Sequence, residues 1–229
     1  MEAWDMKLAF SLERFWLCLS GLKKNIYHGF YGLTANKYME SYEKWFCVVE
    51  EAIKKSGYRA DVFMVIAEDV KQMAVLFSPS EAPRCTPEEL AAQINALGQQ
   101  IYEEEIFKGD TRYCNVTALS NELHGFSGIR EGYLQTRRLN DLSFFRMAPE
   151  VLTEEKVERL RNGADYRIVM GECRRLEQAL DRGDDPVCKK QLDALFLKTV
   201  KGAYSWTLLQ DALSYCKHML EVRCTARGV

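Results

Sequence analysis

The chain has 229 residues and a mass of 26.4 kDa, with 47% hydrophobic and 28% charged residues. These proportions are typical of an ordinary globular protein and argue against a disordered chain, a collagen-like repeat or a small disulfide scaffold. The formal net charge is only -2. Because phosphate contacts supply most of the affinity of nucleic-acid-binding proteins, this balance argues against direct DNA or RNA binding.

Composition also predicts the compartment. Residues 1–22 are interrupted by charged side chains, so a secretory signal is not predicted, and no apolar run reaches the roughly 20 residues that cross a bilayer. The eight cysteines form no CxxC pair, which argues against a structural zinc site. We therefore expect a cytoplasmic protein with mostly buried, reduced thiols, no metal, no other cofactor and no membrane partner.

The N-terminal segment 3–22 predicts an amphipathic helix. Its large apolar side chains recur at spacings of three and four, which places them on one helix face. Six of them form the candidate dimer surface: Trp4, Leu8, Leu12, Phe15, Trp16 and Leu19. The alternative is a helix that packs on its own domain.

Between residues 26 and 139, strand and helix patterns alternate. Strand-like runs occupy 26–33, 62–67, 73–78 and 113–119, and helical periodicity occupies 37–56, a segment from Thr86 onward, and 122–139. The packing face expected for the last helix consists of Leu123, Phe126, Ile129, Tyr133 and Leu134. The order β-α-β-β-α-β-α is typical of an α+β fold of the split βαβ kind.

Two local signals within this region are strong. The central strand-like runs flank the polar residues 68–72 and predict a hairpin. Thr86, Pro87 and Glu89 predict a capped helix start, since threonine can cap, proline fits the first turn and glutamate can close a capping box.

From residue 149 onward the pattern is helical, with segments 153–182 and 186–222 showing no strand-like run. We therefore expect three parts: an N-terminal helix at 1–24, an α+β domain at 25–148 and a C-terminal helical domain at 149–229.

Candidate catalytic residues do not cluster in the sequence. His28, His124 and His218 fall in three different predicted elements, and no nucleophile signature accompanies them. P-loop and GxGxxG motifs are absent from the sequence. No catalytic, cofactor-binding or metal-binding residue is therefore assigned.

Charged runs are interpreted as solvated surface. The acidic runs at 68–69 and 103–105 lack the neighbouring glycines that let a backbone approach phosphate and metal closely. The arginine pairs at 137–138 and 174–175 lack a surrounding basic excess, so a phosphate clamp is not predicted.

Two segments resemble the middle region of AraC-type response regulators. Leu12-Glu13-Arg14-Phe15-Trp16 followed by Leu19-Ser20-Gly21 resembles the helix that opens that region. Residues 120–145 resemble its strand, helix and aromatic pair, with Tyr133 at the family's tyrosine position and Phe144-Phe145 as the pair.

The resemblance extends over about residues 12–222. Residues 176–200 look like the helical segment that leads toward the DNA-binding domain in that family. Gly132 and Thr136 depart from the family's serine and alanine, which leaves the order of elements intact.

The resemblance implies a degenerate GGDEF-like domain related to nucleotidyl cyclases. A cyclase carries a Gly-Gly-acid motif on its hairpin turn, whereas the turn here reads Glu-Asp-Val-Lys-Gln at 68–72, so no cyclase activity is implied. The family's receiver domain and helix-turn-helix are missing from the sequence. We expect an excised piece of a longer regulator, which meets DNA only through a domain outside this chain.

The expected function is therefore a non-enzymatic regulatory module of a bacterial AraC-type transcription regulator. It would sense a small-molecule effector or an upstream receiver domain, form a homodimer and pass the signal on as a change in helix packing. A ligand cleft, whose residues stay unassigned, is expected between the sheet and the C-terminal helices. Two alternatives stay open: an enzyme acting on a nucleotide or small phosphate ester through a metal held by distant carboxylates, and a ligand-free structural adaptor.

Overall fold

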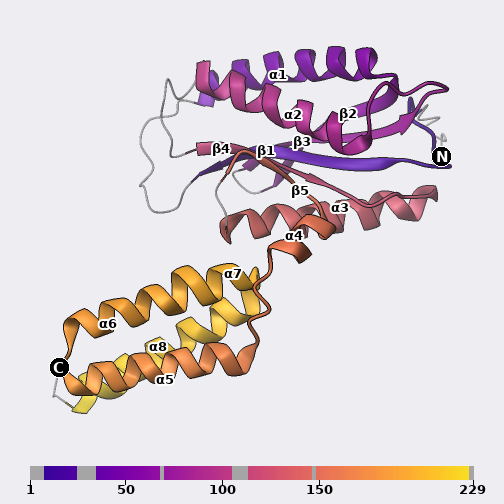
Figure 1. The fold of residues 1–229 in the computed structure, drawn as a ribbon. Coiled ribbons are helices and arrows are strands. Elements are labelled where there is room, and N and C mark those ends of the chain that lie inside the picture. The colour runs from indigo at the N-terminus through magenta and orange to yellow at the C-terminus, as the bar shows by residue number, and fades with distance from the viewer. Residues whose placement is uncertain (1–7, 25–34, 68–69, 105–112, 146–147, 227–229) are drawn as a thin grey trace, which may run out of the picture. The chain divides into compact units, whose positions relative to one another are not determined.

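The computed structural model describes residues 8–24, 35–67, 70–104, 113–145 and 148–226. The chain divides into two compact units after Glu154 (Figure 1). The first, the sheet unit, is a mixed α+β structure, which confirms the expected fold class, and the second, the helical unit, consists of helices.

The sheet unit contains five strands and three main helices in its described part. In chain order they are β1 (Trp16–Lys24), α1 (Ala35–Ser56), β2 (Tyr58–Ala67), β3 (Val70–Pro79), α2 (Pro87–Tyr102), β4 (Tyr113–Leu119), α3 (Gly125–Leu142), the 3-10 turn η2 (Ser143–Phe145) and β5 (Glu150–Leu152).

The sheet has the order β2-β3-β1-β4-β5. Antiparallel pairs join β2 to β3, β3 to β1 and β1 to β4, whereas β5 runs parallel to β4. The first four strands thus follow the split βαβ order, with β1 at the centre. The predicted hairpin is confirmed, since Ala67 pairs with Val70.

The N-terminal helix predicted for 3–22 is wrong. Trp16–Lys24 is the central strand, and Phe15 precedes it in an isolated bridge to Leu123. Alternate residues of β1 face opposite sides of the sheet, so Trp16 packs in one core cluster while Leu17 and Leu19 pack in the other. The strand predicted at 26–33 lies outside the described residues.

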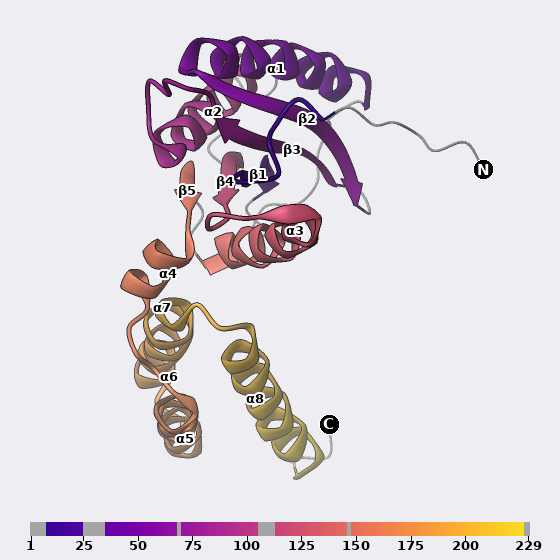
Figure 2. The same cartoon turned by 90° about the vertical axis from the view of Figure 1, so that its right-hand side faces the viewer.

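Helices cover both faces of the sheet, with α1 and α2 on one side and α3 on the other (Figures 1 and 2). The core on the α1–α2 side includes Trp45, Phe77 and Ile94, all fully buried. α1 and β4 confirm the helix predicted at 37–56 and the strand at 113–119. The predicted capping box is also confirmed, because Thr86 and Glu89 bond reciprocally at the start of α2.

The packing face predicted for the helix at 122–139, which is α3, is confirmed at Leu123, which is buried, and at Ile129 and Tyr133, which pack against the same core, but it is wrong at the other two positions. Phe126 and Leu134 are 71% and 52% exposed, whereas the buried positions include Gly128, Gly132 and Thr136. A Cβ added at Gly132 would lie 2.4 Å from a Leu123 methyl carbon. The small residues therefore let the helix approach the sheet closely. Gly132 and Thr136, the two positions that depart from the AraC-type pattern, are part of this packing.

Contrary to the helical prediction after residue 149, Glu150–Leu152 forms the strand β5. It pairs with Val116 to Ala118 of β4 and supplies hydrogen-bonding partners to that edge. Residues 16–24 also belong to the sheet rather than to a separate N-terminal part. The predicted boundary at 148–149 lies a few residues before the division after Glu154.

The helical unit consists of the short helix α4 and three long helical segments in its described part. Its elements are α4 (Glu154–Leu160), α5 (Tyr166–Arg182), α6 (Asp185–Leu192), the π-helical stretch η3 (Asp193–Val200), α7 (Lys201–Ala203) and α8 (Trp206–Ala226), with α6, η3 and α7 continuous. The predicted helix at 153–182 is split between α4 and α5, and the one at 186–222 is broken at Tyr204, whose φ is positive at 49°.

Candidate functional site

A shallow groove of about 500 Å³ lies on the outer side of the sheet unit, where the C-terminal half of α1 passes α2. Its exposed lining surface is mostly apolar, although half of the lining residues are polar or charged. The lining residues are Val48, Glu51, Ala52, Lys55, Ser56, Arg84, Cys85, Gln93, Ala96 and Leu97. Clefts with an apolar floor and a few polar groups are the usual form of small-molecule sites.

The end of α1 shapes one wall of the groove. Gly57 follows the helix with φ +78°, a left-handed conformation that favours glycine at a helix C-terminus. A Cβ at this position would also lie 2.7 Å from the Ala82 carbonyl oxygen. Glycine therefore permits both the turn into β2 and the close passage of the loop at 80–86.

Hydrogen bonds hold that loop against the helix end. The Ser80 amide donates to the Gly57 carbonyl oxygen at 3.1 Å, and the Arg84 amide donates to that of Ser56 at 2.9 Å. The Tyr58 hydroxyl donates to the Cys85 carbonyl oxygen at 2.9 Å. These bonds place Arg84 and Cys85 beside the groove, directly before the cap of α2.

The charges around the groove are unevenly compensated. Lys55 pairs with Glu51 at 2.6 Å, and this hydrogen bond lowers the pKa of the Glu51 carboxyl. Within the part of the chain that the structure describes, the Arg84 guanidinium has no acidic partner. Burial, followed by the charge of Glu89, raises the pKa of Cys85, so that thiol stays neutral. Among the charged residues that line the groove, Arg84 is thus the one cation without an ion pair in the described part of the chain.

A buried polar network beneath α2 fixes the helix on the sheet. The Asn115 side-chain amide donates to the Ser20 hydroxyl at 3.1 Å and to both oxygens of Asn95 at 3.2 Å. Thr117 donates to Asn95 at 3.0 Å, and the Asn115 backbone amide donates to Gln99 at 2.7 Å. Because buried polar groups need partners, this network specifies one register of α2 on β1 and β4.

The predicted dimer surface is not exposed as a stripe. Trp4 lies outside the described residues, and Leu8 and Leu12 are partly buried against the core on the α3 side. The remaining three members, Phe15, Trp16 and Leu19, are buried in the sheet unit. The prediction is therefore wrong for Phe15, Trp16 and Leu19, because they lie in or directly before the central strand β1, whose two faces are covered.

The other charged and imidazole groups singled out in the sequence do not converge. His124 and His218 are exposed and belong to different units, and His28 lies outside the described residues. Glu103 and Glu104 are exposed and accept hydrogen bonds from glutamines one turn earlier in α2. Among the described residues, no group of three or more His, Cys, Asp or Glu could hold a metal ion.

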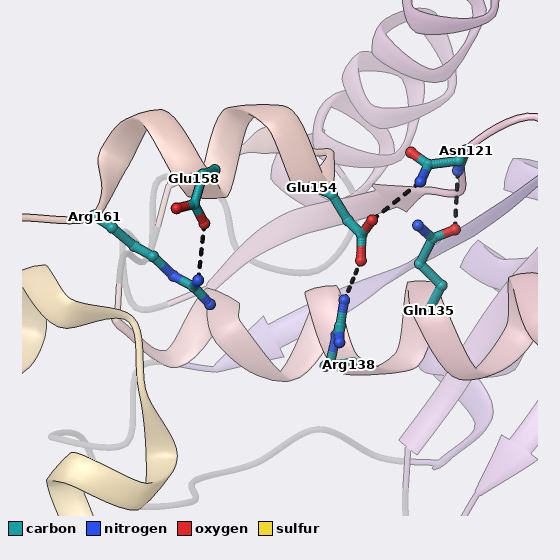
Figure 3. Close-up of polar contacts among 6 residues, drawn as sticks. All are labelled: Asn121, Gln135, Arg138, Glu154, Glu158 and Arg161. Carbon is teal, nitrogen blue, oxygen red and sulfur yellow. Dashed lines mark hydrogen bonds and ion pairs between the residues drawn. The ribbon is translucent and has the colours of Figure 1, made fainter. Parts of the chain in front are cut away.

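Arg138, one of the paired arginines, already has an acidic partner. Figure 3 shows the Glu154 carboxylate between the Arg138 guanidinium and the Asn121 side-chain amide, which donates at 3.0 Å. The Asn121 backbone amide donates to Gln135 at 2.9 Å, so this network ties the end of β4 to α3. Figure 3 also shows the separate pair of Arg161 and Glu158, 2.8 Å apart, in the helical unit.

Sequence reasoning missed the groove. Its members come from α1, α2 and the loop between β3 and α2, and no motif links them. The available signals were the Ser56-Gly57 helix stop and the Thr86 cap, between which Arg84 follows a proline. The cleft expected between the sheet and the C-terminal helices stays a prediction.

No family model and no curated protein match this chain. A solved structure, the active GGEEF domain of a diguanylate cyclase from Vibrio cholerae, is similar at 12% identity and a TM-score of 0.40. The match covers 62% of this chain and 83% of that one. None of the helices in the described residues is long and apolar enough to cross a membrane.

Proposed function

We propose that this chain is the ligand-sensing module of a bacterial AraC-type transcription regulator. Its effector is a small amphiphilic anion that binds in the groove between α1 and α2. The observation that carries the proposal is the groove itself, with an apolar floor and the uncompensated Arg84 cation at its rim. Sensing requires binding and a change of packing, and it requires no bond chemistry.

The chemistry of the lining defines the class of effector. Val48, Ala52 and Leu97 offer apolar contact, and the small side chain of Ala96 leaves room above them. A guanidinium presents several donors in a plane, which suits a carboxylate, sulfonate or phosphate. An aromatic or aliphatic acid satisfies both requirements.

The regulator assignment rests on the resemblance of residues 120–145 and on the order of the units, whereas the segment at 12–21, compared with a helix of that family, runs into the strand β1 here. The resemblance implies a GGDEF-like α+β domain followed by helices. The chain has a split βαβ sheet unit followed by a helical unit. The assignment is tested by the reading frame around this segment: an in-frame helix-turn-helix supports it, and a frame that encodes none contradicts it.

Ligand binding is tested with 8-anilinonaphthalene-1-sulfonate, an aromatic anion, titrated into the isotope-labelled chain and followed by amide NMR shifts. We expect shifts confined to the second half of α1, residues 80–86 and α2. Arg84→Gln should weaken binding about tenfold, because a charge-assisted hydrogen bond is lost. Ala96→Phe should abolish binding by filling the groove without entering the core.

The matched control is Arg130→Gln, which removes another exposed arginine of the sheet unit from α3. It should leave the affinity unchanged. Equal weakening by both arginine changes would indicate general charge attraction, and binding that survives both Arg84→Gln and Ala96→Phe would exclude the groove.

The homodimer stays a prediction, now without its original surface, since Phe15, Trp16 and Leu19 are buried. Analytical ultracentrifugation of the chain tests it directly: a concentration-dependent dimer supports it, and a monomer over the micromolar range contradicts it.

A further inference from the structure

One edge of the sheet is a long strand. β2 has 10 residues and, among the described strands, pairs with β3 alone. The backbone N–H and C=O groups on its other side therefore have no partner strand in the described part of the chain. The opposite edge, β5, has only three residues, and a very short edge strand is one of the means by which proteins prevent edge pairing. β2 is thus the edge that can accept a further strand.

β2 lacks the features that usually protect an edge strand. Its register with β3 runs over all ten positions without a skipped residue, so no bulge bends it away. The strand contains no proline and no lysine, and its charged residues are Arg59 and Asp61, both in the first half. The Asp61 carboxylate already accepts a hydrogen bond from the Ala9 amide at 2.7 Å. The second half is uncharged and regular, which favours pairing with another strand.

Two large apolar side chains lie exposed at the middle of this edge. Phe63 is 41% exposed and Met64 is 39% exposed. Because they are consecutive in a strand, they face opposite sides of the sheet. Val65 packs in the core on the α3 side and Val62 packs in the core on the α1–α2 side, so Phe63 faces the α3 side and Met64 the other. A strand added beside β2 would cover both side chains.

We propose that two copies of this chain form a dimer by antiparallel pairing of their β2 strands, with the twofold axis at Phe63. Directly opposed residues of an antiparallel pair are either both hydrogen-bonded or both not, so the axis must pass through a residue. An axis at Arg59 or Asp61 would place like charges directly opposite each other, which is destabilising. An axis at Phe63 places this ring opposite its own copy and Met64 opposite Val62 of the second copy.

The size of the edge fits a stable dimer. α1 packs on β2 and widens the surface that a second copy would meet. A strand of ten residues is about 33 Å long, and a sheet with one helix layer is about 20 Å thick. Pairing would therefore bury roughly 1,300 Å² over the two copies, within the range of specific protein interfaces and above that of most crystal contacts.

This surface concerns the predicted homodimer and is independent of the effector groove. The groove is tested by ligand binding and the edge by the state of association, so either proposal can fail while the other holds.

A charge-swap experiment tests the pairing. Analytical ultracentrifugation of the full wild-type chain should show a concentration-dependent dimer in the micromolar range. Phe63→Lys and Phe63→Glu each place two like charges opposite one another on the axis, so each variant alone should raise the dissociation constant of the dimer at least about tenfold. An equimolar mixture of the two variants should recover the dimer, because lysine then faces glutamate. Since the Phe63 side chain is exposed, circular dichroism should show the wild-type fold in both variants.

The matched control is Phe126→Lys, which places the same charge at an exposed phenylalanine of α3 and should leave the dimer unchanged. A monomeric wild-type chain, which would leave the edge to a strand of another protein, overturns the proposal. A mixture of the two Phe63 variants that stays monomeric overturns it as well. So does a dimer that tolerates Phe63→Lys and is lost on Leu213→Lys, because the interface would then lie on the exposed side of α8.

Discussion

Gly98, in the interior of α2, should resist substitution although alanine is the better helix former. A Cβ added there would lie 2.5 Å from the Asn115 side-chain nitrogen and 3.0 Å from a ring carbon of Trp45. The nitrogen belongs to the buried network and cannot move without losing its bonds to Ser20 and Asn95.

Three contributions set the change in the free energy of unfolding that Gly98→Ala should cause. Overpacking a well-packed site is destabilising by about 1–3 kcal/mol, and breaking a buried hydrogen bond adds about 1–3 kcal/mol. The gain in helix propensity from glycine to alanine is about 1 kcal/mol. Gly98→Ala should therefore lower the free energy of unfolding of the sheet unit by about 1–5 kcal/mol.

Urea unfolding followed by tryptophan fluorescence measures this change, since Trp16 and Trp45 are buried in the sheet unit. Gly171→Ala is the control: no atom lies within 4 Å of a Cβ added at this α5 position, so it should stabilise the helical unit by about 1 kcal/mol. If Gly98→Ala also stabilises the protein, the close contact between α2 and Asn115 is refuted.

Three further predictions follow from single contacts. A hydrogen bond from Cys173 lowers the pKa of Cys216 to about 7, so the alkylation rate of Cys216 by iodoacetamide should rise with pH through about 7, because the thiolate is the reactive form. Cys173→Ala removes the donor, raises that pKa and should slow the reaction at pH 7 by up to roughly fiftyfold, whereas an unchanged rate would disprove the hydrogen bond. Thr86→Ala should lower the free energy of unfolding by about 1 kcal/mol through loss of the capping box, and no change in urea unfolding would count against it. Leu139→Ala should be destabilising by about 2–5 kcal/mol, whereas Leu134→Ala on the exposed side of α3 should change stability by less than about 0.5 kcal/mol; equal effects would contradict the observed helix face.

The wrong helix prediction for residues 3–22 shows where hydrophobic periodicity fails to separate a helix from a strand. The run from Phe15 to Leu19 is apolar at every position, so a subset at helical spacing can always be chosen from it. A strand buried on both faces produces the same continuous run. Only the pairing of β1 with β3 and β4 distinguishes the two interpretations.

The candidate groove could not be predicted from the sequence either, because its residues meet only through tertiary packing. Arg84 and the groove-lining part of α1 meet because the Gly57 turn brings the loop at 80–86 across the helix end. Likewise α5 contacts α8, although no spacing in the sequence relates these two helices. Residues joined only through packing leave no local motif.

The sequence alone determined the features whose physical cause is local: the capped start of α2, the β2–β3 hairpin, the periodic helix α1 and the α+β class. A helix closes its hydrogen bonds within a few residues, and a cap or a tight turn does the same, so neighbouring side chains specify them. A strand finds its partners in distant segments, and the residues that line a groove also come from distant segments. The tertiary structure therefore decided β1, β5, the small-residue positions in the buried face of α3 and the candidate groove.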